Sequence, residues 1–283
     1  MSSAQLIFGC VYLLVVVVAA PFYMRFLYVF LSQKRYRCLQ CYRIILLMGL
    51  VQIAMIPGWI VDCLTQIFNK DVFFASFLCK TSIVGVRTEG ILGLALAVNR
   101  LKIMCRLPLP SAVHTALLVF AFLFYIAHFG VCLTPWAGLI VVPGYFLVRE
   151  DNTKPYSALI GEFSGIIYQV CLVTTFVAYV IIVLHSIYVQ AQLKHVHSVR
   201  KERPILLYAG IRFLIDMTMS IIYHYAHLPP TAETATVLCG IYLVNCLFVP
   251  PFLYICINRT MREEFFTSSN IKTAVLPIDS VEN

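Results

Sequence analysis

The stretch from Ala75 to Met104 reads ASFLCKTSIVGVRTEGILGLALAVNRLKIM, and it decides the fold that the sequence predicts. It is a long apolar run with Arg87 and Glu89 near its middle. In a helix that rises about 1.5 Å per residue, about 20 apolar residues cross the roughly 30 Å hydrocarbon core of a bilayer. Charged side chains within such a span are costly unless they face other helices or a wet cavity. We therefore predict a membrane span at the centre of a helix bundle.

The rest of the chain is also apolar. Hydrophobic residues make up 61% of the 283 residues and charged residues only 12%, which excludes a soluble globular domain. Apolar runs of about 18 residues or more predict seven spans, which cover residues 5–30, 42–67, 75–104, 113–133, 161–188, 204–226 and 235–257. Residues 258–266 predict a short amphipathic helix, with Met261 and Phe265 on one face, and residues 269–283 predict a disordered cytoplasmic tail. The predicted fold is an all-α membrane protein, a seven-transmembrane helix bundle in residues 1–268.

Lysines and arginines are divided unequally between the two sets of loops. Fourteen lie in the connections after spans one, three, five and seven, whereas the opposite set holds only Lys70, Lys80, Arg149 and Lys154. Because positively charged loops stay on the cytoplasmic side, the N-terminus is predicted outside and the C-terminus inside. The net charge of +8 therefore reflects topology and does not indicate a nucleic-acid partner. With a short outer N-terminal tail, an extracellular ligand is expected to be a small molecule.

The cysteines and histidines do not indicate catalysis. The eleven cysteines are scattered through the spans, which is typical of small packing residues. Cys38 and Cys41 form a single CxxC motif. It is either a metal or redox site or part of a solvated loop whose cysteines could carry a lipid. His195 and His197 lie in an inner loop, whereas His224 lies at the outer end of span six, so they cannot share a metal. We expect no enzyme activity, no cofactor and no metal.

Several motifs resemble those of rhodopsin-like G-protein-coupled receptors. They are Asn99-Arg100 at the inner end of span three and Pro251-Phe252-Leu253-Tyr254 at the end of span seven. More narrowly, the nematode serpentine chemoreceptors of the Srt and Srx classes have motifs similar to Cys41-Tyr42-Arg43-Ile44, Gly49-Leu50-Val51-Gln52 and Leu96-Ala97-Val98-Asn99-Arg100. The resemblance covers roughly residues 41–265. It implies a rhodopsin-like receptor that binds a small ligand within the bundle and signals to a heterotrimeric G protein. The implied location is the plasma membrane, which includes the ciliary membrane of sensory neurons.

The same resemblance implies roles for inner residues. Contacts with the G protein are implied for Asn99, Arg100, Lys102, Arg106, Lys194, Arg200, Lys201 and Arg203. The activation motif would comprise Asn245, Pro251 and Tyr254. Asn99 stands where the family usually has an acid, so we expect a weaker restraint on Arg100, because an amide can only hydrogen-bond to it. The alternative is that Arg100 merely anchors the span in the inner lipid headgroups.

Other positions depart from the family pattern. Gln52 stands in place of a buried aspartate, so a sodium site is not expected, and Pro250 replaces an asparagine for which Asn245 could substitute. Cys79 lies near the position that carries a disulfide in the family, but residues 134–160 contain no cysteine. Cys132 is the only nearby candidate partner, and we expect the standard disulfide to be absent. Span seven contains no lysine, which argues against retinal and a light receptor.

Four intramembrane charges match in depth. Arg87 and Asp216 both lie about 20 Å from the inner face, and Glu89 and Arg212 lie at about 16 and 14 Å. If spans three and six are neighbours, Arg87–Asp216 and Glu89–Arg212 could form two ion pairs between them. These charges either line a ligand cavity or only hold the helices in register.

Together with polar residues near the outer ends of the spans, these charges give ten candidate ligand-binding residues. They are Asp62, Arg87, Glu89, Glu162, Tyr168, Gln169, Arg212, Asp216, Tyr223 and His224. Instead of binding a ligand, the outer acids could be solvated residues at the rim of the bundle. The tyrosines could instead anchor the helices at the membrane interface.

A multi-pass transporter or channel subunit is the alternative function, because buried charges also mark substrate and ion pathways. Transporters often contain internal repeats with broken helices, and the seven spans show no repeat. Ligand-evoked signalling without substrate uptake would separate the two functions.

Overall fold

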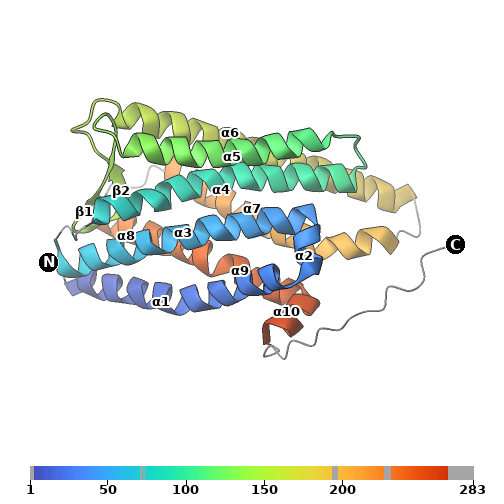
Figure 1. The fold of residues 1–283 in the computed structure, drawn as a ribbon, viewed down its shortest axis with the longest axis horizontal. Coiled ribbons are helices and arrows are strands. Elements are labelled where there is room, and N and C mark those ends of the chain that lie inside the picture. Colours follow the sequence, from blue (N-terminus) through green and yellow to red (C-terminus); the bar gives the residue numbers. More distant parts are fainter. Residues whose placement is uncertain (1–2, 71, 73, 193–196, 226–230, 267–283) are drawn as a thin grey trace.

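The computed structural model describes residues 3–70, 72, 74–192, 197–225 and 231–266. Within these ranges it describes all side chains except those of residues 35, 37, 190–192, 197–205, 224 and 225. The predicted disordered tail, residues 269–283, lies outside the described residues. The described chain is an elongated bundle of long helices that run side by side (Figure 1).

Seven membrane spans form the bundle. Six are single helices long and apolar enough to cross a bilayer, and the seventh is a bent pair of helices. The single helices are α1 (Ser3–Ser32), α3 (Gln40–Phe68), α4 (Ala75–Met104), α5 (Ser111–Cys132), α6 (Ser157–Gln192) and α7 (His197–Tyr225). The pair is α8 (Ala232–Leu247) and α9 (Val249–Ile257). The predicted seven-transmembrane helix bundle is confirmed.

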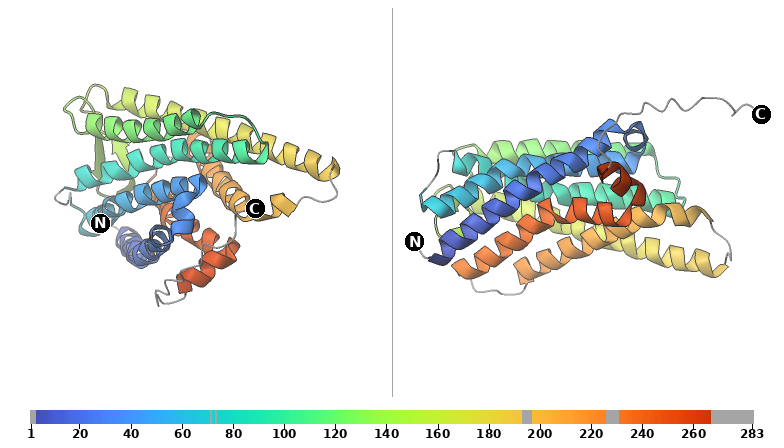
Figure 2. Two further views of the ribbon diagram at one scale, coloured as in Figure 1. Left: turned by 45° about the vertical axis from the view of Figure 1, so that its right-hand side comes forward. Right: turned by 90° about the horizontal axis from the view of Figure 1, so that it is seen from below.

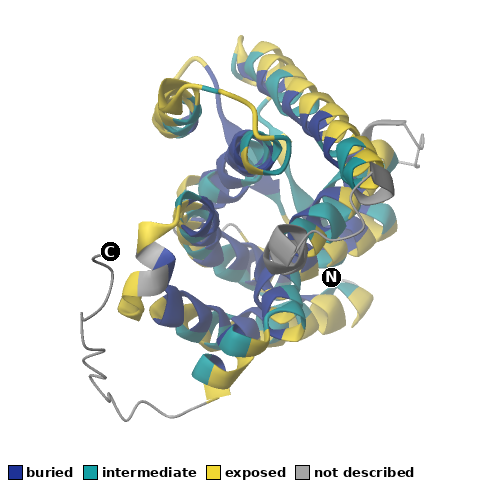
Figure 3. Ribbon diagram, turned by 90° about the vertical axis from the view of Figure 1, so that its right-hand side faces the viewer, coloured by how far each residue is buried: buried dark blue, intermediate teal, exposed yellow. Residues whose placement is uncertain are grey.

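Helix α4 is the central span, as its two internal charges predicted. It packs against α3, α5, α6 and α7. In its most apolar window 61% of the residues are buried, against 17–50% in the other five single-helix spans. Large apolar side chains on α5 and α6, such as Phe122 and Phe163, are instead exposed, which suits contact with lipid. Exposed residues, in yellow, lie on the outside of the bundle in Figure 3. The charged span thus avoids lipid because the other helices surround it.

The seventh span, predicted as residues 235–257, is not one straight helix. Helices α8 and α9 meet at Phe248 with a bend of 43°. Pro250 and Pro251, in the first turn of α9, explain the bend, because proline lacks a backbone N–H and its ring clashes with the carbonyl of residue i−4. Carbonyl groups in the last turn of α8 are therefore available to other donors.

A β-hairpin, which the sequence did not predict, lies in the connection between α5 and α6. Its strands β1 (Leu139–Val142) and β2 (Tyr145–Glu150) are antiparallel, with Leu139 opposite Glu150. Gly144 forms the turn with φ 87, a left-handed conformation that favours glycine. The hairpin lies at the same end of the bundle as the N-terminus (Figure 1). We call this the hairpin end, and the opposite end, where Arg100 lies, the basic end.

Other helix bounds also differ from the predicted spans. A short helix, α2 (Lys34–Cys38), lies between α1 and α3. Helices α6 and α7 extend toward the basic end beyond the predicted spans 161–188 and 204–226. Hydropathy marks only the apolar part of a helix, and polar residues can continue the helix beyond it.

Aromatic side chains fill the core at the basic end. The ring of Phe30 lies 4.9–5.8 Å, centroid to centroid, from the rings of Phe26, Tyr36, Tyr42 and Tyr254. These side chains come from α1, α2, α3 and α9. We call these five side chains the aromatic cluster, and their packing joins the first span to the last.

The helix α10 (Arg259–Phe266) packs on this end of the bundle (Figure 2). Met261 and Phe265 share one face, as predicted, and both are buried. The Phe265 ring lies 5.0 Å from that of Phe22 in α1, so this apolar face packs against the protein. Tyr36 donates a hydrogen bond to Glu264 Oε2 at 2.9 Å, which adds a polar contact between α2 and α10.

Candidate functional site

A cavity of about 460 Å³, here the outer cavity, opens at the hairpin end. Side chains from α3, α4, α6, α7, α8 and β2 form its walls. Its volume falls within the range of small-molecule sites, about 300–1,000 Å³. Six of the ten candidate ligand-binding residues line it, namely Asp62, Arg87, Glu162, Tyr168, Gln169 and Tyr223. Sequence reasoning thus found much of the wall of one real cavity.

The other four candidates do not line the outer cavity in the part of the chain that is described. Glu89, Arg212 and Asp216 line a smaller, deeper cavity of about 40 Å³, here the inner cavity, which has room for about three water molecules. The side chain of His224 lies outside the described residues. The candidates with described side chains therefore divide into an outer set that could touch a ligand and a deeper set around the inner cavity.

The β-hairpin forms one wall of the outer cavity and is held by Gln66 of α3. The Gln66 side chain is fully buried. Its Oε1 accepts a hydrogen bond from the backbone N–H of Gly144 at 2.8 Å. Its Nε2 donates to the backbone carbonyls of Tyr145 at 3.1 Å and Val142 at 3.3 Å. One amide therefore satisfies three backbone groups of the turn, and we call this contact the Gln66 clamp.

The base of the hairpin is held by a second polar contact. Lys154 Nζ donates to the backbone carbonyls of Thr134 at 2.8 Å and Ala137 at 3.0 Å. The hydroxyl of Ser157 accepts a hydrogen bond from the N–H of Gly138 at 3.0 Å. Both ends of the hairpin are thus fixed by side chains, without a covalent link.

The candidate disulfide between Cys79 and Cys132 is not formed. All eleven cysteines are thiols, and Cys79 Sγ donates a hydrogen bond to the carbonyl of Gly58 at 3.3 Å. The Gln66 clamp and Lys154 hold the outer connection where the resemblance would place a disulfide. Among the described residues, no group of three His, Cys, Asp or Glu side chains could hold a metal ion.

Arg87 does not pair with Asp216, and this prediction was wrong. The Nη1 of Arg87 donates a hydrogen bond to the hydroxyl of Ser164 in α6, while Asp216 contacts Arg212 and Asn245. Equal depth in two helices does not bring two side chains together, because each must also point toward the other around its helix axis. Arg87 points toward α6 and the outer cavity, where the Glu150 carboxylate attracts it electrostatically.

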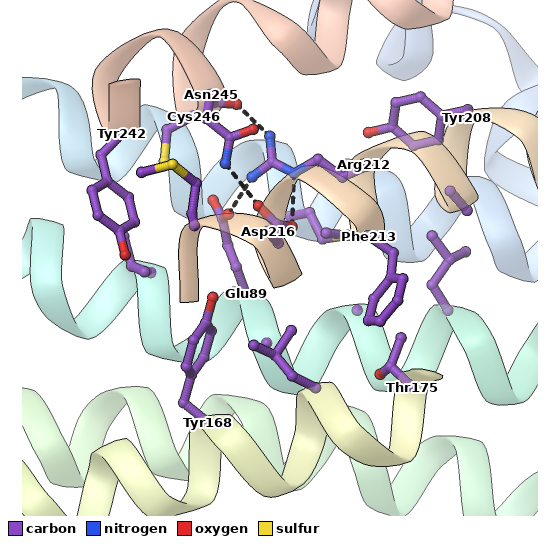
Figure 4. A pocket seen from close by; sticks show the side chains of 18 of the residues that line it. Glu89, Tyr168, Thr175, Tyr208, Arg212, Phe213, Asp216, Tyr242, Asn245 and Cys246 are labelled. Carbon is purple, nitrogen blue, oxygen red and sulfur yellow. Dashed lines mark hydrogen bonds and ion pairs between the residues drawn. The ribbon is translucent and has the colours of Figure 1, made fainter. Parts of the chain in front are cut away.

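Glu89 and Arg212 do pair, as predicted. Arg212 Nη2 donates to Glu89 Oε2 at 2.8 Å, and both side chains are buried. Arg212 Nε also donates to Asp216 Oδ2 at 3.0 Å, one turn along α7. Asn245 Nδ2 donates to Asp216 Oδ1 at 2.7 Å. Glu89, Arg212, Asp216 and Asn245 thus form one polar network across α4, α7 and α8, drawn in Figure 4.

The backbone of α8 completes this network. Arg212 Nη1 donates to the carbonyl of Asn245, one of the last carbonyls of α8 before the bend. The bend at Phe248 explains why that oxygen is available, since the last four carbonyls of a helix have no intrahelical donor. Asn245, expected only to substitute for a motif residue, is therefore bonded to α7 through both its side chain and its backbone.

Two tyrosines separate the outer cavity from the network. Tyr168 of α6 and Tyr242 of α8 line both cavities. Figure 4 shows their rings beside the network. Tyr168 comes close to α4 because residue 90 is glycine: a Cβ there would lie 2.6 Å from the Tyr168 ring. A ligand in the outer cavity would therefore touch side chains that also contact the space around Arg212.

At the basic end, Arg100 is fully buried. The alternative that it reaches the lipid headgroups is therefore wrong for this structure. Asn99 Nδ2 donates to Gln40 Oε1 of α3 at 3.1 Å. Lys102 is partly exposed and Arg106 is exposed. Asn99 is thus bonded to α3, where the family's acid would hold the arginine.

The structure describes the motif residues, but it describes the remaining basic candidates only in part. Lys194 lies outside the described residues, and the side chains of Arg200, Lys201 and Arg203 are not described. Pro251 is buried at the bend, and Tyr254 is buried in the aromatic cluster. The roles in G-protein contact and activation that the resemblance implies for these residues are proposals.

Sequence reasoning missed several lining residues, for which some signals existed. Trp59, which lines the outer cavity, and Gln66, which holds the hairpin, lie one turn to either side of Asp62 in α3, so a 3.6-residue period from Asp62 would have found them. Tyr242 lies one turn before Cys246 on the polar-network side of α8. Glu150 carried no such signal, because only the unpredicted hairpin brings it over the bundle.

Comparison with known proteins shows which known fold the chain shares. No family model matches the chain, and no curated protein matches it. Among solved structures, the chain is similar to squid rhodopsin, with a TM-score of 0.67 over 93% of this chain and 84% of that one. Sequence identity is only 12%, so the likeness concerns the fold alone. The chain has the seven-helix fold of rhodopsin.

Proposed function

We propose that this protein is a G-protein-coupled receptor that binds a small molecule in the outer cavity and signals to a heterotrimeric G protein at the basic end. The rhodopsin-like fold supports a receptor. The observation that carries the proposal is the stacking of the outer cavity directly on the buried network of Glu89, Arg212, Asp216 and Asn245, with Tyr168 and Tyr242 between them.

The proposed mechanism runs through α7 and α8. A ligand that contacts Tyr168 or Tyr242 changes the packing beside Arg212, whose bonds join α7 to α4 and to the last turn of α8. A ligand shifts such an equilibrium only through different contacts in the two states, and these two tyrosines provide them. Rearranged α7 contacts would open the basic end around Arg100, which is fully buried here and must become accessible to the G protein.

The orientation follows from the charge of the loops. The hairpin end faces the outside with the N-terminus, and the basic end and the C-terminus face the cytoplasm. G-protein contacts are proposed for Arg100, Lys102 and Arg106 and for the basic connection between α6 and α7. The motif resemblance supports a chemosensory receptor of the nematode serpentine kind in the plasma membrane, with a small extracellular ligand.

A nucleotide-exchange assay tests this function. The full chain would be reconstituted in lipid nanodiscs with heterotrimeric G proteins of several subtypes and exposed to a panel of small organic molecules. We expect at least one panel member to stimulate exchange, and Arg100→Ala to reduce the stimulated rate about tenfold or more. Lys70→Ala, an exposed cation at the hairpin end, is the matched control and should leave the rate unchanged.

The same preparation separates the receptor from a transporter. In sealed proteoliposomes, the active molecule should not accumulate inside in any imposed ion gradient. Stimulated exchange that survives Arg100→Ala, or uptake of the ligand without stimulated exchange, would contradict the proposed function.

A further inference from the structure

We infer that the outer cavity recognises a small organic cation, a protonated amine, with Asp62 of α3 as its counterion. This inference rests on the proposed function only in taking the outer cavity as the ligand site. It names the ligand's charge and the residue that selects for it.

The charge of the cavity wall favours a cation. Among the described lining residues, three carry acids, namely Asp62, Glu150 and Glu162, and one carries a base, Arg87. The two sides of the cavity are unlike. Glu150 of β2 and Arg87 of α4 attract one another on the side of α6, whereas Asp62 lies on α3.

Asp62 lacks a cationic partner among the described side chains. Its side chain is 3% exposed, and its one hydrogen bond comes from Gln66 Nε2 at a long 3.4 Å. Gln66 directs its stronger bonds to the hairpin, so it contributes little to the carboxylate. A buried carboxylate without a paired charge is costly. An ammonium group in the cavity would supply the missing charge and N–H donors.

Arg87 is poorly placed to bind an anionic ligand instead. Its Nη1 already donates to Ser164, and Glu150 competes for the guanidinium. Glu150 lies against α6, where residue 161 is glycine and a Cβ would collide with the carboxylate. An anion in the cavity would therefore be repelled by the carboxylates of Glu150 and Glu162, which line it together with Arg87.

Aromatic side chains surround the space beside Asp62. Trp59 lies one turn before it on the same face of α3 and is 7% exposed, and Phe146, Tyr168 and Tyr242 complete the apolar wall. Aromatic faces attract cations through their quadrupole, and Trp does so most strongly. A carboxylate with flanking aromatic rings suits an amine on an apolar or aryl body.

Charge-selective labelling of the cavity tests this inference without a known ligand. Ile83 lines the cavity, and Ile83→Cys would place a thiol there. The purified full chain would be treated with cationic aminoethyl or anionic sulfonatoethyl methanethiosulfonate, and labelling of residue 83 would be followed by mass spectrometry. We expect the cationic reagent to react about tenfold faster or more. Asn152→Cys, in an exposed loop, is the control for reagent reactivity.

Two further substitutions predict opposite changes in that ratio. Asp62→Asn should lower the cation-to-anion ratio at residue 83 at least about threefold, whereas Arg87→Gln should raise it. Glu162→Gln, at an exposed position, should change it less than Asp62→Asn because water screens its charge. A ratio that favours the anionic reagent, or one that ignores Asp62→Asn, would overturn the inference.

Protection experiments then test the ligand class. Ile83→Cys protein would be labelled with neutral methyl methanethiosulfonate in the presence of 2-phenylethylamine, 2-phenylethanol or 3-phenylpropanoate, together with larger scaffolds in the same three forms. Amines should slow the labelling, and Asp62→Asn should weaken that protection about tenfold or more. Protection by carboxylates, or by no amine, would refute the inference. Protection by amines without nucleotide exchange would refute the proposed function alone.

Discussion

Arg212 and Glu89, 123 residues apart in the sequence, are joined by a 2.8 Å hydrogen-bonded ion pair between α7 and α4. Both side chains are buried, and Arg212 also bonds Asp216 and the carbonyl of Asn245. One guanidinium thus connects three spans. Removing one partner of a buried pair leaves an uncompensated charge, which costs more than the pair itself contributes.

Arg212→Ala should therefore be the most destabilising substitution in the network. It leaves the buried Glu89 unpaired beside the partly buried Asp216, so we expect a loss of about 3–5 kcal/mol of unfolding free energy. Thermal unfolding in detergent and delivery to the cell surface measure this loss. Glu89→Gln, which keeps a hydrogen-bonding group while removing one acid, should cost less.

A double-mutant cycle separates this pair from the rest of the network. The cycle would combine Glu89→Gln with Arg212→Met, and we expect a coupling energy of about 1 kcal/mol or more, since the residues are in contact. Arg87→Gln combined with Arg212→Met serves as the matched control, because Arg87 bonds Ser164 instead. Equal coupling in both cycles would contradict a specific Glu89–Arg212 interaction.

Gln66→Leu should release the tip of the hairpin. The substitution keeps the volume of the side chain but removes three hydrogen bonds to residues 142–145. Each such bond contributes about 0.5–1.5 kcal/mol, so amide exchange at Gly144 should become about 10- to 100-fold faster. Hydrogen–deuterium exchange with mass spectrometry measures this change. Gln169→Leu, on another wall of the same cavity, should leave exchange at Gly144 unchanged.

Depth along a helix could be predicted from the sequence, whereas direction around it could not. Glu89 and Arg212 were matched by counting residues from the inner ends of their spans, and they do pair. Arg87 and Asp216 matched equally well in depth and do not pair. Each residue turns the side-chain direction by about 100°, so a small error in the assumed helix faces separates two residues that share a level.

Features made by distant backbone segments were also beyond the sequence. The seven spans and the central position of α4 follow from hydropathy and internal charge. The clamp does not, because Gln66 bonds a turn 78 residues away in the sequence, and a pattern within either segment does not show which distant segment it contacts. The bend at Pro250 and Pro251 was not predicted, and the use of the Asn245 carbonyl by Arg212 depends on how α7 and α8 pack.

The titration of Glu150 should make stability depend on pH. Glu150 lies in β2, outside the spans, and partial burial raises the pKa of its carboxyl, while Arg87 opposes that shift and Glu162 adds to it. A folded-state pKa above the unfolded value means that the protonated acid favours folding. Stability from this group is therefore present below the unfolded pKa and is lost as pH rises through the folded pKa.

Glu150→Gln should remove that part of the pH dependence. The difference in unfolding temperature between the variant and the parent chain should grow as pH rises from about 4 through the raised pKa of Glu150. Arg87→Gln should shift the change to higher pH, because the lowering influence of the guanidinium on this pKa is lost. A difference that stays constant with pH would show that Glu150 titrates alike in both states.

The bend between α8 and α9 should depend on Pro250 and Pro251. Replacing both with alanine restores two backbone N–H groups, which can bond the carbonyls of Cys246 and Leu247 and straighten the 43° bend. A straighter helix draws the Asn245 carbonyl back into intrahelical bonding and away from Arg212, so stimulated nucleotide exchange should fall. Spin labels at exposed positions near the two ends of the seventh span would measure the angle by electron–electron distance. Pro57→Ala, which changes a proline inside α3, is the matched control and should leave that distance unchanged. If the double alanine variant keeps the bend, packing against α1 and α7 rather than proline sets its angle.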